Sequence, residues 1–180
     1  STRLVDSTVS GNTVTTFGGG GIYSGDYGDL TLVRSTVSGN YAVGRGGGIA
    51  TGNYTELRLF NSTVSGYVSG DEGGGINVGH GGPDVILENS SVIGNSAPSI
   101  GGIVYDDFGS TNLSLSNSIV AYNSGLDCLH PTPIDQGGNF DGDGSCGLTT
   151  IVPGVDFDPA LANNGGPTRT HKLLRGSVAI

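Results

Sequence analysis

A pattern of apolar, hydroxyl and glycine residues returns along this chain every 27 or 28 residues. Isoleucines recur at a spacing of 27, and valines recur at spacings of 28, 27, 28 and 28: Ile22, Ile49, Ile76 and Ile103, and Val9, Val37, Val64, Val92 and Val120. A regular period of this size is typical of solenoids, propellers and arrays. Glycine and β-branched residues dominate the repeat, which argues against helices. A propeller blade needs four strands and about 40 residues, so the shorter coil predicts about three strands per turn.

Each repeat alternates in the way that is typical of a half-buried strand. Leu30 and Leu32 point to one side, and Val37 points to the same side after a bend. We expect the bend at a column that tolerates left-handed backbone angles, and a further turn at a glycine column: Arg34, Asn61, Asn89 and Asn117, and Gly39, Gly66 and Gly94. Stacked coils place equivalent residues about 4.8 Å apart. We predict an all-β, right-handed parallel β-helix of about 27–28 residues per coil, because parallel crossovers almost always take that hand.

The repeat divides the chain into two parts of a single domain. Residues 1–123 are predicted to form the coils, and residues 124–180, which contain five prolines, are predicted to form an irregular C-terminal cap over the open end. Cys128 and Cys146 lie in the cap, where we expect a disulfide; two buried thiols are the alternative. Ser1 opens inside a repeat with no visible signal peptide, so we expect a mature or excised fragment.

The charge balance excludes some partners. The formal net charge is -9, which argues against nucleic acid and against anionic membranes, since both require a basic surface. No stretch approaches the roughly 20 apolar residues of a membrane helix, so we expect no membrane-spanning segment. The oligomeric state is left open.

Loops between the Gly-rich strand and the Leu-x-Leu strand hold most of the aromatic and acidic side chains of the coils. Tyr27 and Tyr54 are predicted to stack, with Phe108 near the same line, as a carbohydrate-binding strip. The acids that precede each Leu-x-Leu strand form a column whose like charges must splay, take up protons or bind a cation such as calcium: Asp29, Glu56 and Asp84, followed by Asn112. Solvated loop tips are the alternative.

Three further patterns could carry chemistry. Asn139, Asp141 and Asp143 resemble half of a calcium-binding EF-hand loop, or an Asx-rich turn. Glycine triplets, such as those at residues 46–48 and 73–75, precede the isoleucines of the repeat. The charged residues before these two Gly triplets could form a surface ion pair, or a lyase-like site with arginine as base and the carboxylates on calcium: Arg45, Asp71 and Glu72. Outward Thr-x-Ser pairs could form an ice-binding hydroxyl face, or could reflect strand propensity alone: Thr8/Ser10, Thr36/Ser38 and Thr63/Ser65.

The repeat segments at residues 61–66 and 73–76 resemble those of bacterial right-handed parallel β-helix repeat proteins. The tail at residues 164–180, and Asp127-Cys128 with Gly144-Ser145-Cys146-Gly147, resemble the end of secreted choice-of-anchor Q domain proteins. Arg169, Lys172 and Arg175 stand where that family often has Pro, Ala and Pro. The resemblance implies secretion or surface display on a pectate-lyase-like superfold, without an agreed activity.

These patterns lead to a ranked hypothesis. We expect a secreted or cell-surface module with an adhesive, carbohydrate-facing or structural role, with polysaccharide or a surface glycan as partner and calcium as the only candidate cofactor. A polysaccharide lyase or glycoside hydrolase on the same scaffold is the first alternative, with Asp106 as a further candidate carboxyl group. Ice binding is the second.

Overall fold

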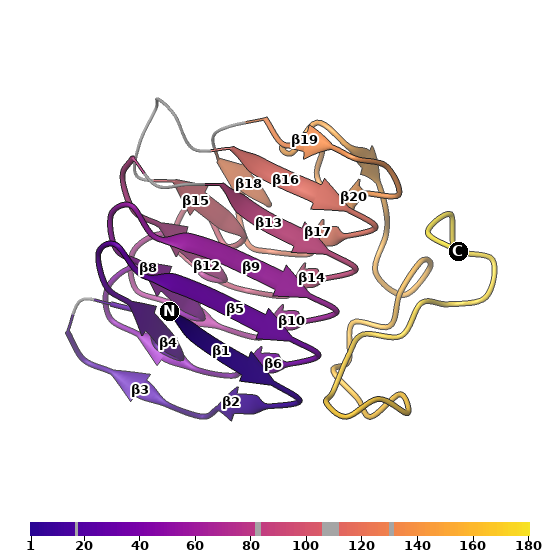
Figure 1. The fold of residues 1–180 in the computed structure, drawn as a ribbon. Coiled ribbons are helices and arrows are strands. Elements are labelled where there is room, and N and C mark those ends of the chain that lie inside the picture. Colours follow the sequence, from indigo (N-terminus) through magenta and orange to yellow (C-terminus); the bar gives the residue numbers. More distant parts are fainter. Residues whose placement is uncertain (17, 82–83, 106–111, 130–131) are drawn as a thin grey trace.

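The computed structural model describes residues 1–16, 18–81, 84–105, 112–129 and 132–180. Its strands form parallel sheets that wind around a common interior, and the described residues contain no helix (Figure 1). Sheet A contains, in spatial order, β1 (Thr2–Val5), β5 (Asp29–Val33), β9 (Glu56–Phe60), β13 (Val85–Glu88), β16 (Leu113–Ser116) and β19 (Ile134–Asp135). Sheet B contains β2 (Thr8–Ser10), β6 (Thr36–Ser38), β10 (Thr63–Ser65), β14 (Ser91–Ile93), β17 (Ile119–Ala121), β20 (Phe140–Asp141) and β21 (Thr149–Thr150).

The remaining strands close each coil. Sheet C contains β11 (Val68–Ser69), β7 (Tyr41–Ala42) and β3 (Thr13–Val14). Sheet D contains β18 (Cys128–Leu129), β15 (Ile103–Tyr105), β12 (Ile76–Val78), β8 (Ile49–Thr51) and β4 (Ile22–Ser24). The register follows the sequence period, since Ile22 pairs with Ile49 and Ile76 pairs with both Ile49 and Ile103. The predicted stacking of equivalent residues is confirmed.

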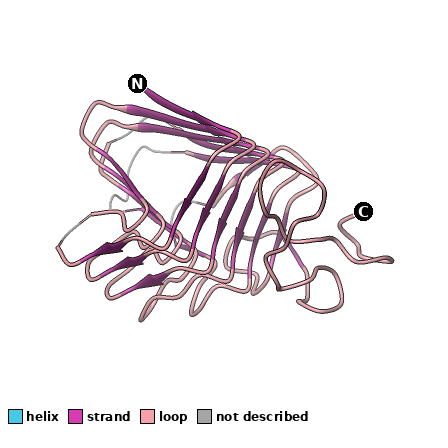
Figure 2. Cartoon of the chain, turned by 90° about the horizontal axis from the view of Figure 1, so that it is seen from below, coloured by secondary structure: helices cyan, strands magenta, loops and turns pink. Residues whose placement is uncertain are grey.

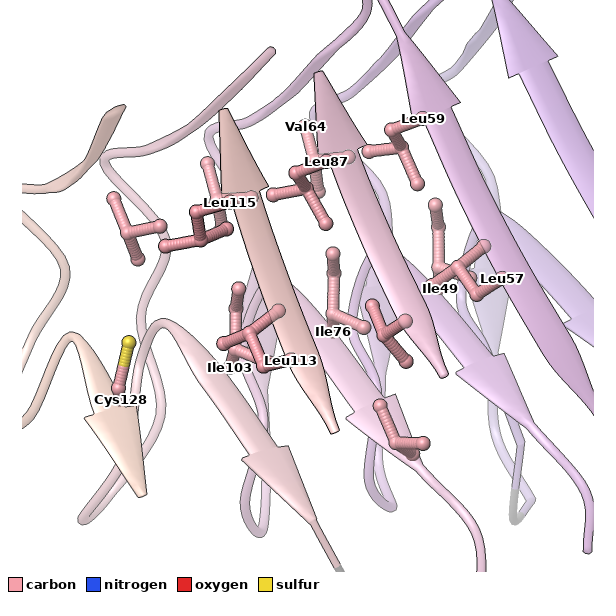
Figure 3. Close-up of a cluster of buried hydrophobic side chains, with 14 of the residues drawn as sticks. Ile49, Leu57, Leu59, Val64, Ile76, Leu87, Ile103, Leu113, Leu115 and Cys128 are labelled. Atoms are coloured by element: carbon pink, nitrogen blue, oxygen red, sulfur yellow. The ribbon is translucent and has the colours of Figure 1, made fainter. Parts of the chain in front are cut away.

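The interior is built from apolar columns that run along the solenoid axis. Leu30, Leu57, Val85 and Leu113 form one column, and Leu32, Leu59, Leu87 and Leu115 form the next; all are buried. The isoleucines of sheet D face them across the interior, and Cys128 continues that column after Ile103 (Figure 3). Truncating a buried leucine to alanine in such a core costs about 2–5 kcal/mol, so these columns dominate stability.

The turns explain the polar residues of the repeat. The bend residues after sheet A adopt left-handed angles as predicted, with φ of 47° at Arg34, 50° at Asn61, 49° at Asn89 and 48° at Asn117. The Gly triplets are needed for close approach of the coils, because a Cβ at Gly48 would lie 2.5 Å from the carbonyl oxygen of Gly75. This spacing leaves no room for a side chain at that position.

Hydroxyl and amide ladders accompany the apolar columns. The backbone N–H of Ser35 donates to Ser62 Oγ at 3.1 Å, and that of Ser62 donates to Ser90 Oγ at 3.1 Å. Interior asparagines form a second ladder at the next turn of each coil. There Asn95 Nδ2 donates to the carbonyl of Val64 at 3.2 Å. Tyr67 takes the place of asparagine in that column and accepts from Asn40 Nδ2 at 3.2 Å. Each ladder satisfies buried polar groups that would otherwise be costly.

The strand ladders extend beyond residue 123, where the repeat in the sequence is lost. β18 pairs with β15, β19 with β16, and β20 with β17, so residues 124–150 add a further, irregular layer to the coils. The expected disulfide between Cys128 and Cys146 is present and buried. It joins the interior column of sheet D to the loop after β20.

Residues 152–180, which we call the strap, do not cover the end of the solenoid. They run beside the coils along the outer face of sheet B (Figures 1 and 2). Phe157 is fully buried against Ile93, Ile119 and Ile151, so the outward isoleucines of the later coils form the apolar seat of the strap. The strap folds on itself through antiparallel bridges between Phe157 and Leu173 and between Ala162 and Thr170.

The strap changes the interpretation of the Thr-x-Ser pairs. They stack as predicted, but Thr36, Thr63 and Ser65 are buried. Thr36 Oγ1 donates to the carbonyl oxygen of Arg169 at 2.6 Å, and Ser65 Oγ lies 2.8 Å from His171 Nε2. The prediction of an exposed hydroxyl face for ice binding is therefore wrong for the second and third pairs, because the strap lies over them and bonds to Thr36 and Ser65; Thr8 and Ser10 of the first pair are exposed.

Candidate functional site

Among the described residues, the loops between sheets D and A present the most exposed aromatic side chain of the coils, that of Tyr27. The rings of Tyr27 and Tyr54 stack with centroids 5.0 Å apart and planes inclined by 12°. Their exposed fractions are 79% and 52%. Both residues adopt left-handed backbone angles, with φ of 58° and 55°, which turn equivalent side chains of successive coils in the same direction. The predicted stack is present, and Phe108 lies outside the described residues.

Hydrogen bonds between the loops of successive coils, which we call the polar ladder, hold these loops in place. The backbone N–H of Asn53 donates to Asp26 Oδ1 at 2.7 Å, and the N–H of His80 donates to Asn53 Oδ1 at 3.0 Å. The N–H groups of Tyr27 and Tyr54 donate to the carbonyls of Asn53 and His80 at 2.8 and 3.1 Å. Each loop is therefore bonded to the loop of the next coil, and the tyrosines sit on a fixed support.

The acidic column beside the tyrosines is partly neutralised by the protein itself. Asp29 and Glu56 are paired in the register of sheet A, and Glu56 makes an ion pair with Arg58. Asp84 accepts a hydrogen bond from Asn112 Nδ2 at 2.9 Å. In the described part of the chain, no group of three or more His, Cys, Asp or Glu side chains is arranged to hold a metal ion. Calcium at this column stays a prediction.

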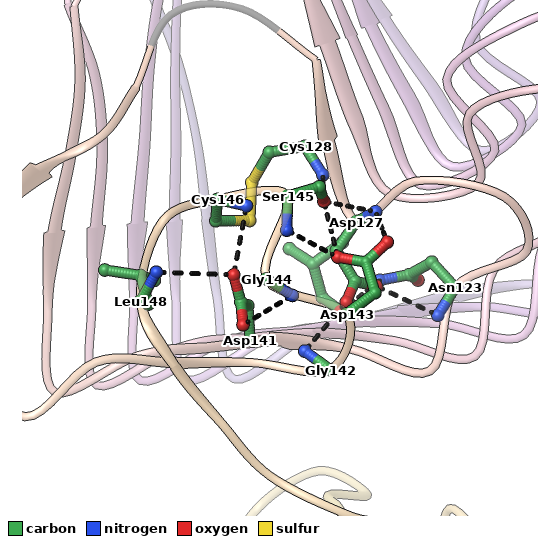
Figure 4. The surroundings of a disulfide bond; sticks show 11 residues. Asn123, Asp127, Cys128, Asp141, Gly142, Asp143, Gly144, Ser145, Cys146 and Leu148 are labelled. Carbon is green, nitrogen blue, oxygen red and sulfur yellow. Dashed lines mark hydrogen bonds between the residues drawn. A yellow bond between two sulfur atoms is a disulfide. The ribbon is translucent and has the colours of Figure 1, made fainter.

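The side chains of the EF-hand-like segment face backbone N–H groups. Asp141 is buried, and its carboxylate accepts from the N–H groups of Gly144 at 3.1 Å and Cys146 at 3.0 Å (Figure 4). Asp143 Oδ1 accepts from the N–H of Ser145 at 2.8 Å, and Asn139 Oδ1 accepts from the N–H of Ser118 at 2.8 Å. These contacts are those of an Asx-rich turn, and they occupy oxygens that a calcium ion would need.

The structure also brings Arg45, Asp71 and Glu72 together. Arg45 Nε lies 3.2 Å from Asp71 Oδ2, and Arg45 Nη2 lies 3.6 Å from Glu72 Oε2. All three side chains are at least one-third exposed. This geometry is that of a surface ion-pair cluster, and the lyase-like role of these residues stays a prediction. Asp106, the further carboxyl group considered for hydrolysis, lies outside the described residues.

The stacked parallel coils are the observation that decides the family. A family model described as "Right handed beta helix region" matches residues 3–145. The chain belongs to this family. No curated protein and no solved structure gives a match. The right hand expected for the coils is thereby confirmed.

One carboxyl group of this right-handed β-helix has a strongly altered environment. Burial raises the pKa of Asp127 to about 6, beside the disulfide and close to Asp143. Its carboxylate accepts from Asn123 Nδ2 at 2.8 Å and from the N–H of Gly142 at 2.8 Å (Figure 4). These bonds tie the loop before β18 to the loop after β20, so Asp127 has a structural position rather than a place in an open cleft.

The sequence analysis did not identify several residues that support the edge formed by Tyr27 and Tyr54, which we call the tyrosine edge. Asp26, Asn53 and His80 recur at a spacing of 27, as do Tyr27, Tyr54 and Gly81. Reading those two columns together would have shown that a polar ladder supports the rings of this β-helix. A Cβ at Gly81 would lie 3.0 Å from the Tyr54 ring, so the glycine leaves space for the second tyrosine. Nothing in the sequence marked Arg58 as the partner of Glu56, apart from its place on the outward face of β9.

In the described residues, we find no helix that is both long and apolar enough to cross a membrane.

Proposed function

We propose that this right-handed β-helix is a binding module, secreted or displayed on a bacterial surface, that holds a carbohydrate chain against the edge formed by Tyr27 and Tyr54. The observation that carries the proposal is the pair of stacked, exposed rings on a hydrogen-bonded support. Tyrosine is enriched at binding interfaces, because its ring buries a large apolar area while its hydroxyl keeps a polar partner.

The chemistry of the edge suits a sugar. The open face of Tyr27 offers an apolar plane for the C–H face of a sugar ring. Asp26 and Asp29 flank a cleft of about 290 Å³ that also contains Tyr23, and their carboxylates can accept hydrogen bonds from sugar hydroxyls. Because the loops are already ordered by bonds between coils, little conformational entropy is lost on binding.

Two features support an extracellular location. The disulfide between Cys128 and Cys146 is of a kind that persists in oxidising compartments. The tail at residues 164–180 resembles that of secreted choice-of-anchor Q domain proteins. An adhesive role in such a location would follow from the binding of a glycan on a neighbouring surface.

The proposal is tested by titrating the protein with neutral and acidic polysaccharides, with and without calcium. Tyr27→Ala should weaken binding about two- to twelvefold, since an aromatic contact contributes about 0.5–1.5 kcal/mol. Tyr122→Ala is the matched control, because Tyr122 is also exposed at 58% and has a φ of 60°. If no polysaccharide binds under either condition, or if Tyr27→Ala binds like the unaltered protein, the proposal fails. A loss of binding on chelation would support calcium at the column of Asp29, Glu56 and Asp84.

A further inference from the structure

Positive charge is concentrated in the last part of the strap, after its two acids Asp156 and Asp158. Residues 159–180 contain no Asp or Glu and hold Arg169, Lys172 and Arg175. The whole chain has seven Lys plus Arg and 16 Asp plus Glu, so residues 1–158 keep four cations and all 16 acids, a net charge of -12. The last 22 residues thus carry a net charge of +3 on the side of an acidic solenoid. A charge asymmetry of this kind points to an interaction surface rather than to a requirement of the fold.

The strap cations differ in environment from three of the four cations of the coils, and resemble the fourth, Arg3, which is exposed. Arg34, Arg45 and Arg58 each make ion pairs with acids of the coils. Arg169, Lys172 and Arg175 are exposed, and none of them makes an ion pair with another described residue. They stand at every third position, and the residues between them are partly covered. A segment of this length spans at most about 20 Å even when fully extended, so the three charges, which we call the row, lie within that distance of one another.

The backbone that carries this row is fixed to the coils. The carbonyl of Arg169 accepts from Thr36 Oγ1 at 2.6 Å, and Thr168 Oγ1 donates to the carbonyl of Arg34 at 3.2 Å. The Phe157 ring and the Phe157–Leu173 bridge hold the other end of the strap. The cations therefore project from an ordered support, which limits the entropy lost when they bind a ligand.

A hydroxyl-lined cleft lies next to the first cation. Arg169 borders a space of about 500 Å³ whose other walls are the early turns of sheet B: Thr8, Ser10, Gly11, Thr36, Ser38 and Gly39. Thr36 is already bonded to the strap, but the hydroxyls of Thr8, Ser10 and Ser38 can donate and accept hydrogen bonds and so match the hydroxyls of a sugar. A guanidinium matches a carboxylate or a sulfate. The ligand that uses both is an anionic carbohydrate.

We propose that the strap row formed by Arg169, Lys172 and Arg175 binds the carboxylate or sulfate groups of an acidic polysaccharide, whose sugar hydroxyls enter the adjoining cleft. A dense polyanion such as nucleic acid, or an anionic membrane, would bring many charges within a Debye length of about 8 Å from the acidic coils and be repelled. A polysaccharide with one anion per sugar has a lower charge density, so its anions can contact the three cations of the row without lying close to the acidic coils. This inference shares the ligand class of the proposed function but uses a different surface.

The test uses the full chain and four probes of similar length: oligogalacturonate, a sulfated dextran, unmodified dextran, and single-stranded DNA. Affinities are measured by calorimetry at low and at physiological ionic strength. Each exposed contact between opposite charges contributes up to about 1 kcal/mol, so Arg169→Gln, Lys172→Gln or Arg175→Gln should each weaken binding of an acidic glycan about threefold, and the triple variant tenfold or more. Arg3→Gln, which removes an exposed cation of β1, is the control and should leave affinity within twofold.

The outcomes separate the strap from the tyrosine edge. A preference for one acidic glycan over the other shows whether carboxylate or sulfate is the anion recognised. If the triple variant binds acidic glycans unchanged, or if DNA binds at least as tightly as they do, the strap inference is overturned. If the triple variant no longer binds acidic glycans while Tyr27→Ala binds every glycan like the unaltered protein, the result would support the strap inference and refute the proposed function. Binding of acidic glycans that depends on Tyr27 and not on the strap would do the reverse.

Discussion

Replacing Phe157 with alanine should release the strap while leaving the coils folded. The ring is 0% exposed and packs on Ile93, Ile119 and Ile151 in a cluster separate from the main interior. A buried phenylalanine truncated to alanine costs about 3–5 kcal/mol. Because the ring lies between the strap and the outer face of sheet B, this cost falls on the docking of the strap. A loss of about 3 kcal/mol raises the undocked population roughly a hundredfold.

Trypsin under native conditions measures that population directly. The strap offers cleavage sites after Arg169, Lys172 and Arg175, whereas Arg34, Arg45 and Arg58 lie within the coils. When docking is fast, the cleavage rate follows the open fraction, so cleavage at the strap should rise about a hundredfold in Phe157→Ala. Val178→Ala is the control on the same segment, since Val178 is 62% exposed and should leave the rate unchanged.

Two results would refute this reasoning. Strap cleavage at the rate of the unaltered protein would show that Phe157 does not hold the strap. Cleavage at Arg58 that accelerates in step with cleavage at the strap would show that the strap and the coils open together. Mass spectrometry of the fragments over time distinguishes both results from the expected one.

Three further predictions follow from individual groups. Burial raises the pKa of Asp127 from its ordinary value of 3.8 to about 6, so the native state binds more protons than the unfolded state between these values. The free energy of unfolding should therefore fall as pH rises through them; urea titrations of the unaltered protein and of Asp127→Asn, which should lack this slope, check it. Burial lowers the pKa of His171 below 6.5, so acidification through that range should favour the undocked strap, seen as faster hydrogen exchange around residue 171 after correction for intrinsic rates. Gly48→Ala places a Cβ 2.5 Å from the Gly75 carbonyl oxygen and should destabilise the protein by about 1–3 kcal/mol in thermal unfolding, whereas Ala50→Gly should cost less.

The sequence predicted the coils well because each coil is determined by its own repeat. Leu32, Leu59 and Leu87 occupy equivalent places, so the period alone places them in one column. The strap could not be predicted in this way, because Phe157 meets Ile93 and Ile119 across distant parts of the chain with no repeat to align them. Those isoleucines, which break the Thr-x-Ser pattern, were the available sign that something apolar covers sheet B.

The candidate site shows the same division. The stack of Tyr27 on Tyr54 follows from the period, since the two residues are 27 apart. The neutralisation of Glu56 by Arg58 does not, because it depends on how one outward side chain turns along β9. The contacts of Asp141 lie where the period has ended, so local turn chemistry decides them.

The strap also affects how the molecule comes apart. In most stacked-repeat proteins each unit contacts only its neighbours, so terminal units fray one at a time. Here a single segment is attached to Thr36 in one turn and to Ile119 three turns further on. Unfolding of any coil between these two points must break this longer link, so the coils that it spans should melt in one cooperative step, and a strap-deleted chain should melt over a broader temperature range.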